Sequence, residues 1–142
     1  MSTYKLTRSS LVILRSDGAS IPADPDNTDY AEYLDWLAAG GVPDPVDPPT
    51  LAESLAAIAA AITRHVDVVA QGHQYADGVA CASYVTSSSA AWANDSRMFV
   101  SWRDAVWQKA ISDQSAIIAG TMALPTDVPA YIATFPTIVW PS

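Results

Sequence analysis

Charge is scarce in this chain, and positive charge most of all. Charged residues make up 15% of its 142 positions, against about 25% in an average soluble domain. Lys and Arg number 7 and Asp and Glu 15, which gives a formal net charge of −8. Because binding to nucleic-acid phosphates needs a surplus of cationic side chains, we expect no nucleic-acid partner. So small a fraction of charged residues is typical of a chain that buries part of its surface against another chain.

Cysteine and long apolar runs are scarce as well. The single cysteine, Cys81, excludes an internal disulfide and a cysteine-based zinc site. No uncharged apolar run reaches the roughly 18 residues that a membrane span needs, and the first residues are not followed by the apolar region of a signal peptide. We therefore expect no membrane partner.

Hydrophobic residues are plentiful, at 50%, so the chain is expected to be ordered with a modest core. Residues 1–41 are predicted to form a small β unit followed by a short acidic helix. Residues 11–14 are β-formers, residues 16–18 signal a turn, and residues 19–22 can return as a partner strand. The alternation over residues 4–8 suggests one more short strand.

The acidic helix is predicted over about residues 29–39, with Asn27 or Thr28 as its N-cap. Its apolar positions recur at helical spacing, at Tyr30, Tyr33, Leu34 and Leu37. Residues 17–53 hold nine acids and no Lys or Arg, while Lys5, Arg8 and Arg15 precede them. The two stretches are predicted to attract each other or a partner of opposite sign.

Residues 42–50 are predicted to be a proline-rich linker, because four prolines in eight residues favour extended chain over helix. Residues 51–142 are predicted to form an α-helical hairpin or bundle. Thr50 and Glu53 form a capping box, and an apolar seam spaced by 4 and 3 follows it at Leu51, Leu55, Ile58, Ile62, His65 and Val69.

The second long helix is predicted from Asn94 or Asp95 to Ala119. It carries two apolar rows, one at Phe99, Trp102, Val106 and Ala110, the other at Val100, Trp107, Ile111 and Ile118. A short helix capped by Thr126 is expected near residues 127–134, followed by an apolar tail that docks on the helices through Trp140. The predicted fold class is α+β, mostly helical.

No catalytic, cofactor or metal site is predicted. His65 and His73 are two helical turns apart, which is too far for one metal without a third element. Cys81 lies in a small apolar context typical of a packing residue. The acidic loop at residues 24–29 lacks the glycine and the terminal glutamate of a calcium loop.

Three stretches carry a resemblance to a known group of proteins. They are LRSDGASIP at 14–22 with NTDYAEYLDWL at 27–37, FVSWRDAVW at 99–107, and LPT at 124–126 leading to FP at 135–136 and WP at 140–141. In these stretches the chain resembles small tail, tail-fibre or tail-fibre-assembly proteins of tailed bacteriophages. That group offers no catalytic residues to transfer to this sequence.

The resemblance implies a non-enzymatic protein of the phage tail. It would be a small structural component attached to the tail fibre or baseplate, or a chaperone that helps a fibre fold or trimerise. Its place would be the virion tail, or the host cytoplasm during assembly. The implied partners are other tail proteins, with a second copy of this chain as a further candidate.

We expect the partner contacts to come from the acidic helix, the apolar seam and the tryptophan helix. The predicted contact residues are Tyr30, Tyr33, Trp36, Leu55, Ile58, Ile62, Trp102, Arg103 and Trp107. The alternative is a module that binds a ligand or a host-surface carbohydrate on an aromatic shelf of Trp92, Trp102 and Trp107. At helical spacing these tryptophans equally suit a core.

Overall fold

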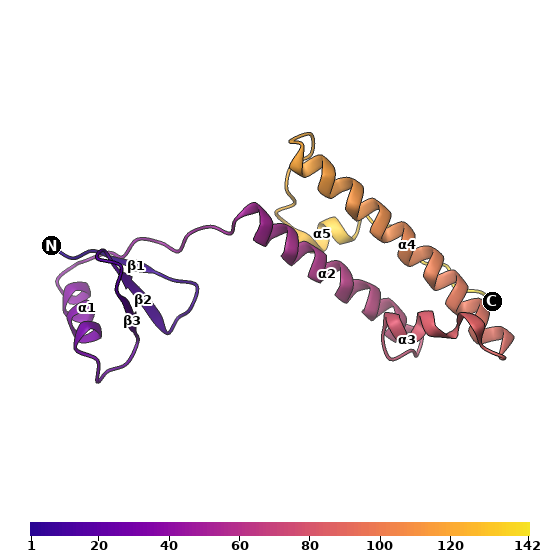
Figure 1. Cartoon of the computed structure of the whole chain (residues 1–142), viewed down its shortest axis with the longest axis horizontal. Helices are drawn as coiled ribbons and strands as arrows, with labels where there is room; N and C mark the ends of the chain where they lie inside the picture. Colours follow the sequence, from indigo (N-terminus) through magenta and orange to yellow (C-terminus); the bar gives the residue numbers. More distant parts are fainter. The chain divides into compact units, whose positions relative to one another are not determined.

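The computed structural model describes all 142 residues, which fold as two units, Met1–Pro49 and Thr50–Ser142 (Figure 1). Helices account for 54% of the chain, and the only sheet is small, three-stranded and antiparallel. The predicted class, α+β and mostly helical, is confirmed. Each unit has its own cluster of buried side chains.

The first unit is a strand meander that packs against one helix. Its strands are β1 (Tyr4–Leu6), β2 (Val12–Arg15) and β3 (Ser20–Pro22), in the order β1-β2-β3. Helix α1 (Thr28–Ala38) follows, and the Asn27 side chain accepts a hydrogen bond from the first turn as its N-cap. Strands this short are marginal alone, so the sheet depends on α1 to cover its apolar face.

The proline-rich segment is part of the first unit and not a free linker, which corrects the boundary predicted at residues 42–50. The amide of Asp44 donates to the Tyr4 carbonyl, and the amide of Leu6 donates to the Asp44 carbonyl, both at 2.9 Å. Pro43 and Pro45 have no N–H to donate, so the pairing with β1 is limited to a single parallel bridge. An ion pair of 2.6 Å between Lys5 and Asp47 extends this contact along the segment.

The second unit is built from helices and an extended tail. Its elements are α2 (Leu51–Gly72), α3 (Gly78–Ser83), the 3₁₀ turn η1 (Tyr84–Thr86), α4 (Ala90–Ile118) and α5 (Val128–Ile132). The capping box at Thr50 and Glu53 forms as predicted, with both reciprocal hydrogen bonds present. Helix α3 was not predicted, because its six residues are too few to show a periodic pattern.

Two helix starts differ from the predicted ones. Helix α4 begins at Ala90 after Ser89, so Asp95 lies more than one turn inside the helix and does not cap it. The N-cap of α5 is Asp127 and not Thr126, and its carboxylate accepts a hydrogen bond from the Ala130 amide. Near both starts the sequence offers more than one residue of the capping type, so propensity alone does not select among them.

The buried stripe of α2 differs from the predicted seam. Its buried residues step by four throughout, at Ile58, Ile62, Val66 and Ala70. The second half of the stripe turns toward α3, where Gly78 packs closely against Val66. His65, expected in the seam, is half-buried beside the Trp102 ring. The buried face of α2 therefore contacts different elements along its length, and not one long neighbouring helix.

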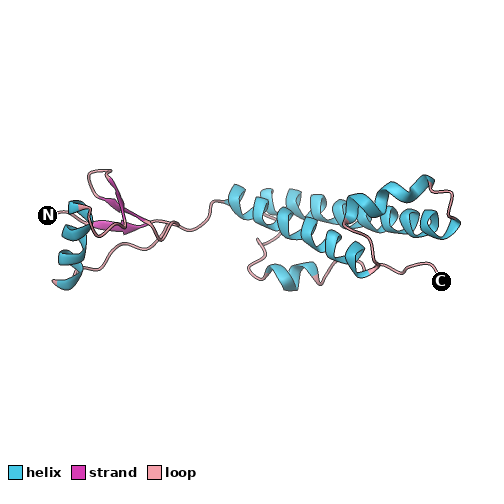
Figure 2. Ribbon diagram, turned by 90° about the horizontal axis from the view of Figure 1, so that it is seen from below, coloured by secondary structure: helices cyan, strands magenta, loops and turns pink.

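The first apolar row of α4 is buried as predicted, and the tail docks along it. From α5 the chain runs back along α4, and the Trp102 indole N–H donates to the Pro136 carbonyl at 2.7 Å. Trp140 then lies parallel to Phe99, with ring centroids 6.1 Å apart. Figure 2 shows α5 and the tail on one side of the α2 and α4 pair. The predicted docking of the apolar tail is confirmed.

We predict that Gly41→Ala destabilises the first unit. A Cβ at this position would lie 2.3 Å from the Trp36 ring, so the indole must leave its place against Tyr4. The expected loss is about 1–3 kcal/mol, as for other overpacked sites. Hydrogen exchange read by mass spectrometry should show faster exchange in residues 4–49 only. Gly72→Ala, at an open position, is the control, and equal exchange in both variants would contradict this packing.

Candidate functional site

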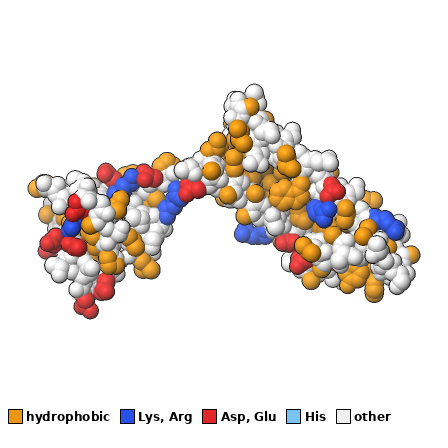
Figure 3. Space-filling view, in the orientation of Figure 1, with side chains coloured by type: hydrophobic (Ala, Val, Ile, Leu, Met, Phe, Trp, Pro, Cys, Tyr) orange, Lys and Arg blue, Asp and Glu red, His pale blue; other side chains and the backbone are white.

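The helical unit carries an apolar groove between α2 and α4. It is a partly open hollow of about 40 Å³, enough for the end of one aliphatic side chain. Figure 3 shows hydrophobic side chains gathered over this part of the unit. The groove is lined by Leu55, Ile58, Ala59 and Ile62 of α2, by Trp107, Ala110, Ile111, Gln114 and Ile117 of α4, and by Tyr131 of α5.

The groove exists because α2 and α4 make few direct contacts with each other, and α5 fills only part of the space beside them. Helix α5 packs against α2 on one side of the pair. Tyr131 is buried there, and its hydroxyl donates to the Asp113 carboxylate of α4 at 2.9 Å. The space that α5 leaves unfilled is the groove. No Asp, Glu, Lys or Arg lines it, so it suits an apolar group.

The second apolar row of α4 continues this surface. Ile111 is 60% exposed and Ile118 is 63% exposed, although both lie at apolar positions of the helix. Leu51, at the first turn of α2, is exposed as well. We expected two buried rows on α4, and only the first is buried. Ile111 and Ile118 thus form an exposed apolar surface that no other element of the helical unit covers.

The nine predicted contact residues fall into three groups. Leu55, Ile58, Ile62 and Trp107 line the groove, although Ile58 and Ile62 are almost fully buried. Trp102 is in the core, and Arg103 lies outside the groove, where it pairs with Asp104 at 2.8 Å. The other three, Tyr30, Tyr33 and Trp36, are on α1 in the first unit.

The α1 aromatic residues pack mainly inside their own unit. Tyr33 is buried, with its ring 5.1 Å from that of Tyr4. Trp36 lies 5.0 Å from Tyr4 and is covered further by Gly41. Tyr30 and Trp36 remain partly open at the edge of this cluster. Tyr33, like Trp102, therefore packs inside its own unit and presents little surface.

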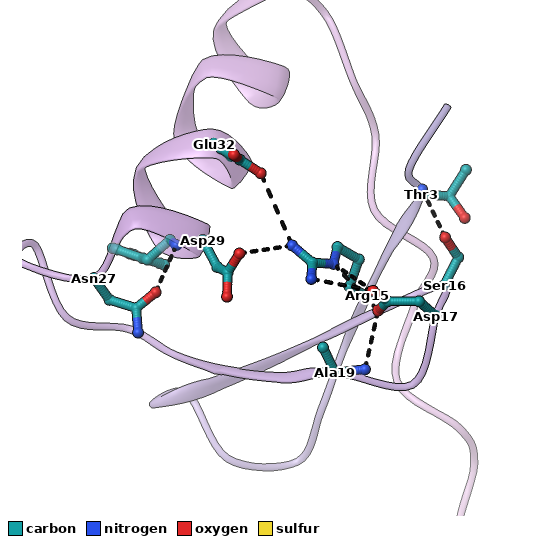
Figure 4. A network of polar contacts seen from close by, with 9 residues as sticks. Thr3, Arg15, Ser16, Asp17, Ala19, Asn27, Asp29 and Glu32 are labelled. Atoms are coloured by element: carbon teal, nitrogen blue, oxygen red, sulfur yellow. Dashed lines mark hydrogen bonds and ion pairs between the residues drawn. The ribbon is translucent and has the colours of Figure 1, made fainter.

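The basic and acidic stretches of the first unit attract each other. Arg15 of β2 reaches Asp29 of α1 at 2.7 Å and Glu32 at 3.8 Å, and its guanidinium also binds Asp17 (Figure 4). The hydrogen bond from Arg15 lowers the pKa of the Asp17 carboxyl. Of the two outcomes predicted for these charges, the structure shows the internal one. Arg15 ties the sheet to the helix.

The predicted tryptophan shelf does not form. Trp102 is 6% exposed and its indole N–H is bonded within the unit, so it offers no open ring face. Trp107 lines the groove, whereas Trp92 lies near the start of α4 with its ring 5.7 Å from that of Tyr84. Three tryptophans on one helix cannot share a platform when their positions point to different sides of it.

Other side chains that could carry chemistry are dispersed. Cys81 is completely buried, and burial raises the pKa of its thiol to about 11, which keeps it protonated at neutral pH. No three His, Cys, Asp or Glu side chains gather where they could hold a metal ion. None of the helices combines the length and the hydropathy of a transmembrane span.

Some groove residues were missed by reasoning from sequence. Ile117, Gln114 and Tyr131 were not predicted to bind, and Ile111 was assigned to a buried row. The 4-3 spacing of residues 107, 111, 114 and 118 on α4 was the available signal, because it continues the second row as a seam. Tyr131 gave no such signal, because its place depends on how the tail folds back.

Comparisons with protein-family models, with curated proteins and with solved structures found no match for this chain. The candidate site therefore depends on its geometry and on the residues described above.

We predict that Asp113→Asn destabilises the helical unit more at neutral pH than at pH 3. Burial raises the pKa of the Asp113 carboxyl, but hydrogen bonds from Lys109 and Tyr131 more than offset it, so the pKa is below its ordinary value of 3.8. The ionised carboxylate thus stabilises the fold above about pH 4, and this is lost as the pH falls through the lowered pKa. The expected difference at pH 7 is about 1 kcal/mol, because the pair is partly exposed.

Urea unfolding followed by circular dichroism at pH 7 and at pH 3 measures this difference. Asp104→Asn is the control, because its carboxylate is an exposed one on the same helix and should contribute little at either pH. If Asp113→Asn cost as much at pH 3 as at pH 7, the charge of Asp113 would not be what stabilises the contact between α4 and α5.

Proposed function

We propose that the chain is a non-enzymatic component of a bacteriophage tail that acts through protein–protein contacts. It is either a small structural part attached to the tail fibre or baseplate, or an assembly factor for that structure. The observation that supports this most is the uncharged groove between α2 and α4, bordered by exposed isoleucines of α4. The sequence resemblance to phage tail proteins agrees with it.

The groove is suited to a helix that inserts one apolar side chain. A hollow of about 40 Å³ is too small for most metabolites, which occupy pockets of several hundred Å³. It has the size of a hole that accepts a knob from a facing helix. Ile111 and Ile118, one heptad apart, would lie beside such a helix and lose their exposed area to it.

The first unit supports the same function in a different way. Its positive side chains are largely used in internal contacts, through Arg15 to α1 and Lys5 to Asp47. The unit therefore presents many acidic side chains with few compensating cations, which would orient it toward a basic surface of a partner. We propose that it supplies charge selectivity while the helical unit supplies the apolar contact.

We predict that Ile111→Asp abolishes binding to the tail partner without unfolding the chain. Ile111 is 60% exposed, so the substitution should leave stability nearly unchanged, while a carboxylate in the groove would be desolvated on binding. Val68→Asp is the matched control, because Val68 is a 56% exposed apolar residue of α2 outside the groove. Circular dichroism should be native for both variants.

Binding is measured by light scattering after gel filtration, with the chain alone and mixed with purified tail-fibre and baseplate proteins of the phage that encodes it. The native chain and Val68→Asp should form a complex of defined mass, and Ile111→Asp should not. A native chain that stays monomeric alone and binds none of these proteins would contradict the proposed function. Equal binding by both variants would reject the groove as the contact.

A further inference from the structure

A second hollow lies at the opposite end of the helical unit, where α2 ends and α4 begins. Its volume is about 510 Å³. It is lined by His73, Gln74, Tyr75, Tyr84, Trp92 and Asp95, together with the backbone at Gly72. The lining combines four aromatic or imidazole rings with one carboxylate, and it includes no Lys or Arg. Unlike the apolar groove, this hollow contains a carboxylate, and the two share no residue.

The carboxylate is held in place. Asp95 is on α4, and its Oδ2 accepts a hydrogen bond from the Tyr75 hydroxyl at 3.2 Å and lies 3.2 Å from Nε2 of His73. Burial and the neighbouring Asp95 raise the pKa of Tyr75 to about 12, so its hydroxyl remains a donor. The His73 ring is stacked on Trp140 at 3.9 Å and 6°. The other oxygen of Asp95, Oδ1, has no hydrogen-bond partner in the chain.

Two of the three ring contacts within the lining are steep, whereas the His73 and Tyr75 rings are closer to parallel, at 25° and 6.2 Å. The ring planes of Tyr75 and Tyr84 differ by 56° at a centroid distance of 5.5 Å, and those of Tyr84 and Trp92 differ by 74° at 5.7 Å. Rings arranged in this way form walls and not a flat platform. Trp92 is 54% exposed, so much of its surface remains open beside its contact with Tyr84.

We propose that this pocket binds an organic cation, namely an alkylammonium group such as that of choline or of a lysine side chain. Aromatic faces attract such cations through the ring quadrupole, and tryptophan does so best. Asp95 adds a carboxylate to the lining, which holds no Lys or Arg, and its Oδ2 is shared with the Tyr75 hydroxyl and the His73 ring. Walls at 56° and 74° can surround a compact ammonium group, whereas the flat face of a sugar stacks on coplanar rings.

The test is a titration of the full chain, followed by the indole N–H signals in ¹H–¹⁵N NMR spectra at constant ionic strength. The probes are choline chloride and Nα-acetyl-lysine methylamide, which distinguish a quaternary headgroup from a peptide side chain, and methyl glucoside as the neutral comparator. We expect both cations to shift the Trp92 signal in a saturable way, one of them more tightly, and the sugar to leave it unchanged.

Three variants locate the interaction. Trp92→Ala should weaken cation binding about three- to tenfold, and Trp92→Phe should weaken it less, because a smaller ring face remains. Asp95→Asn should also weaken cation binding, but the bound cation should still shift the Trp92 indole signal. Met98→Ala, on the exposed side of α4 outside the pocket, is the control and should bind as the native chain does.

Several results would overturn the proposal. They are the absence of a saturable shift with either cation, a shift with the sugar alone, and equal cation binding by the native chain and Trp92→Ala. Trp92 is largely exposed, so its variants should keep the fold, and native circular dichroism verifies this. If the pocket binds no cation, the groove remains the proposed protein contact, because Ile111→Asp and Val68→Asp test that site separately.

Discussion

Burial of one face of α4 holds the helical unit together. Phe99, Trp102 and Val106 lie on this face, and α2, α3 and the C-terminal tail contribute the side chains that cover it. The tail is bound by a hydrogen bond as well as by packing, because the Trp102 indole would otherwise leave its N–H unpaired in the core. A helix of 29 residues is longer than any single element that covers it, so the coverage comes in pieces.

Covering a long helix in pieces leaves gaps, and both candidate sites are such gaps. Where α5 joins α2 and α4, the groove remains beside Ile111. Where α3 and η1 connect the two long helices, the aromatic pocket remains beside Trp92. The first gap is apolar and suited to a partner helix. The second contains a fixed carboxylate, so it is suited to a different kind of ligand.

Local signals predicted much of the fold, because they depend on neighbouring residues. The capping box at Thr50, the cap at Asn27 and the turn at Gly18, whose φ is +91°, all follow from local chemistry. The sites depend on contacts between distant segments. Nothing near Asp95 indicated that His73 and Tyr75 would reach it, and the exposure of Ile111 depends on where α5 stops. Spacing predicts an apolar row, but only packing decides whether it is covered.

We propose that a tail protein binds in the groove between α2 and α4. Hydrogen exchange of the full chain, with and without a candidate tail-fibre or baseplate protein, tests whether the groove is the contact. We expect slower exchange in residues 55–62 and 107–118 of the complex, with the amides around Val68 and Val79 unchanged. If binding slowed exchange only in other segments and left residues 55–62 and 107–118 unchanged, the groove would not be the contact.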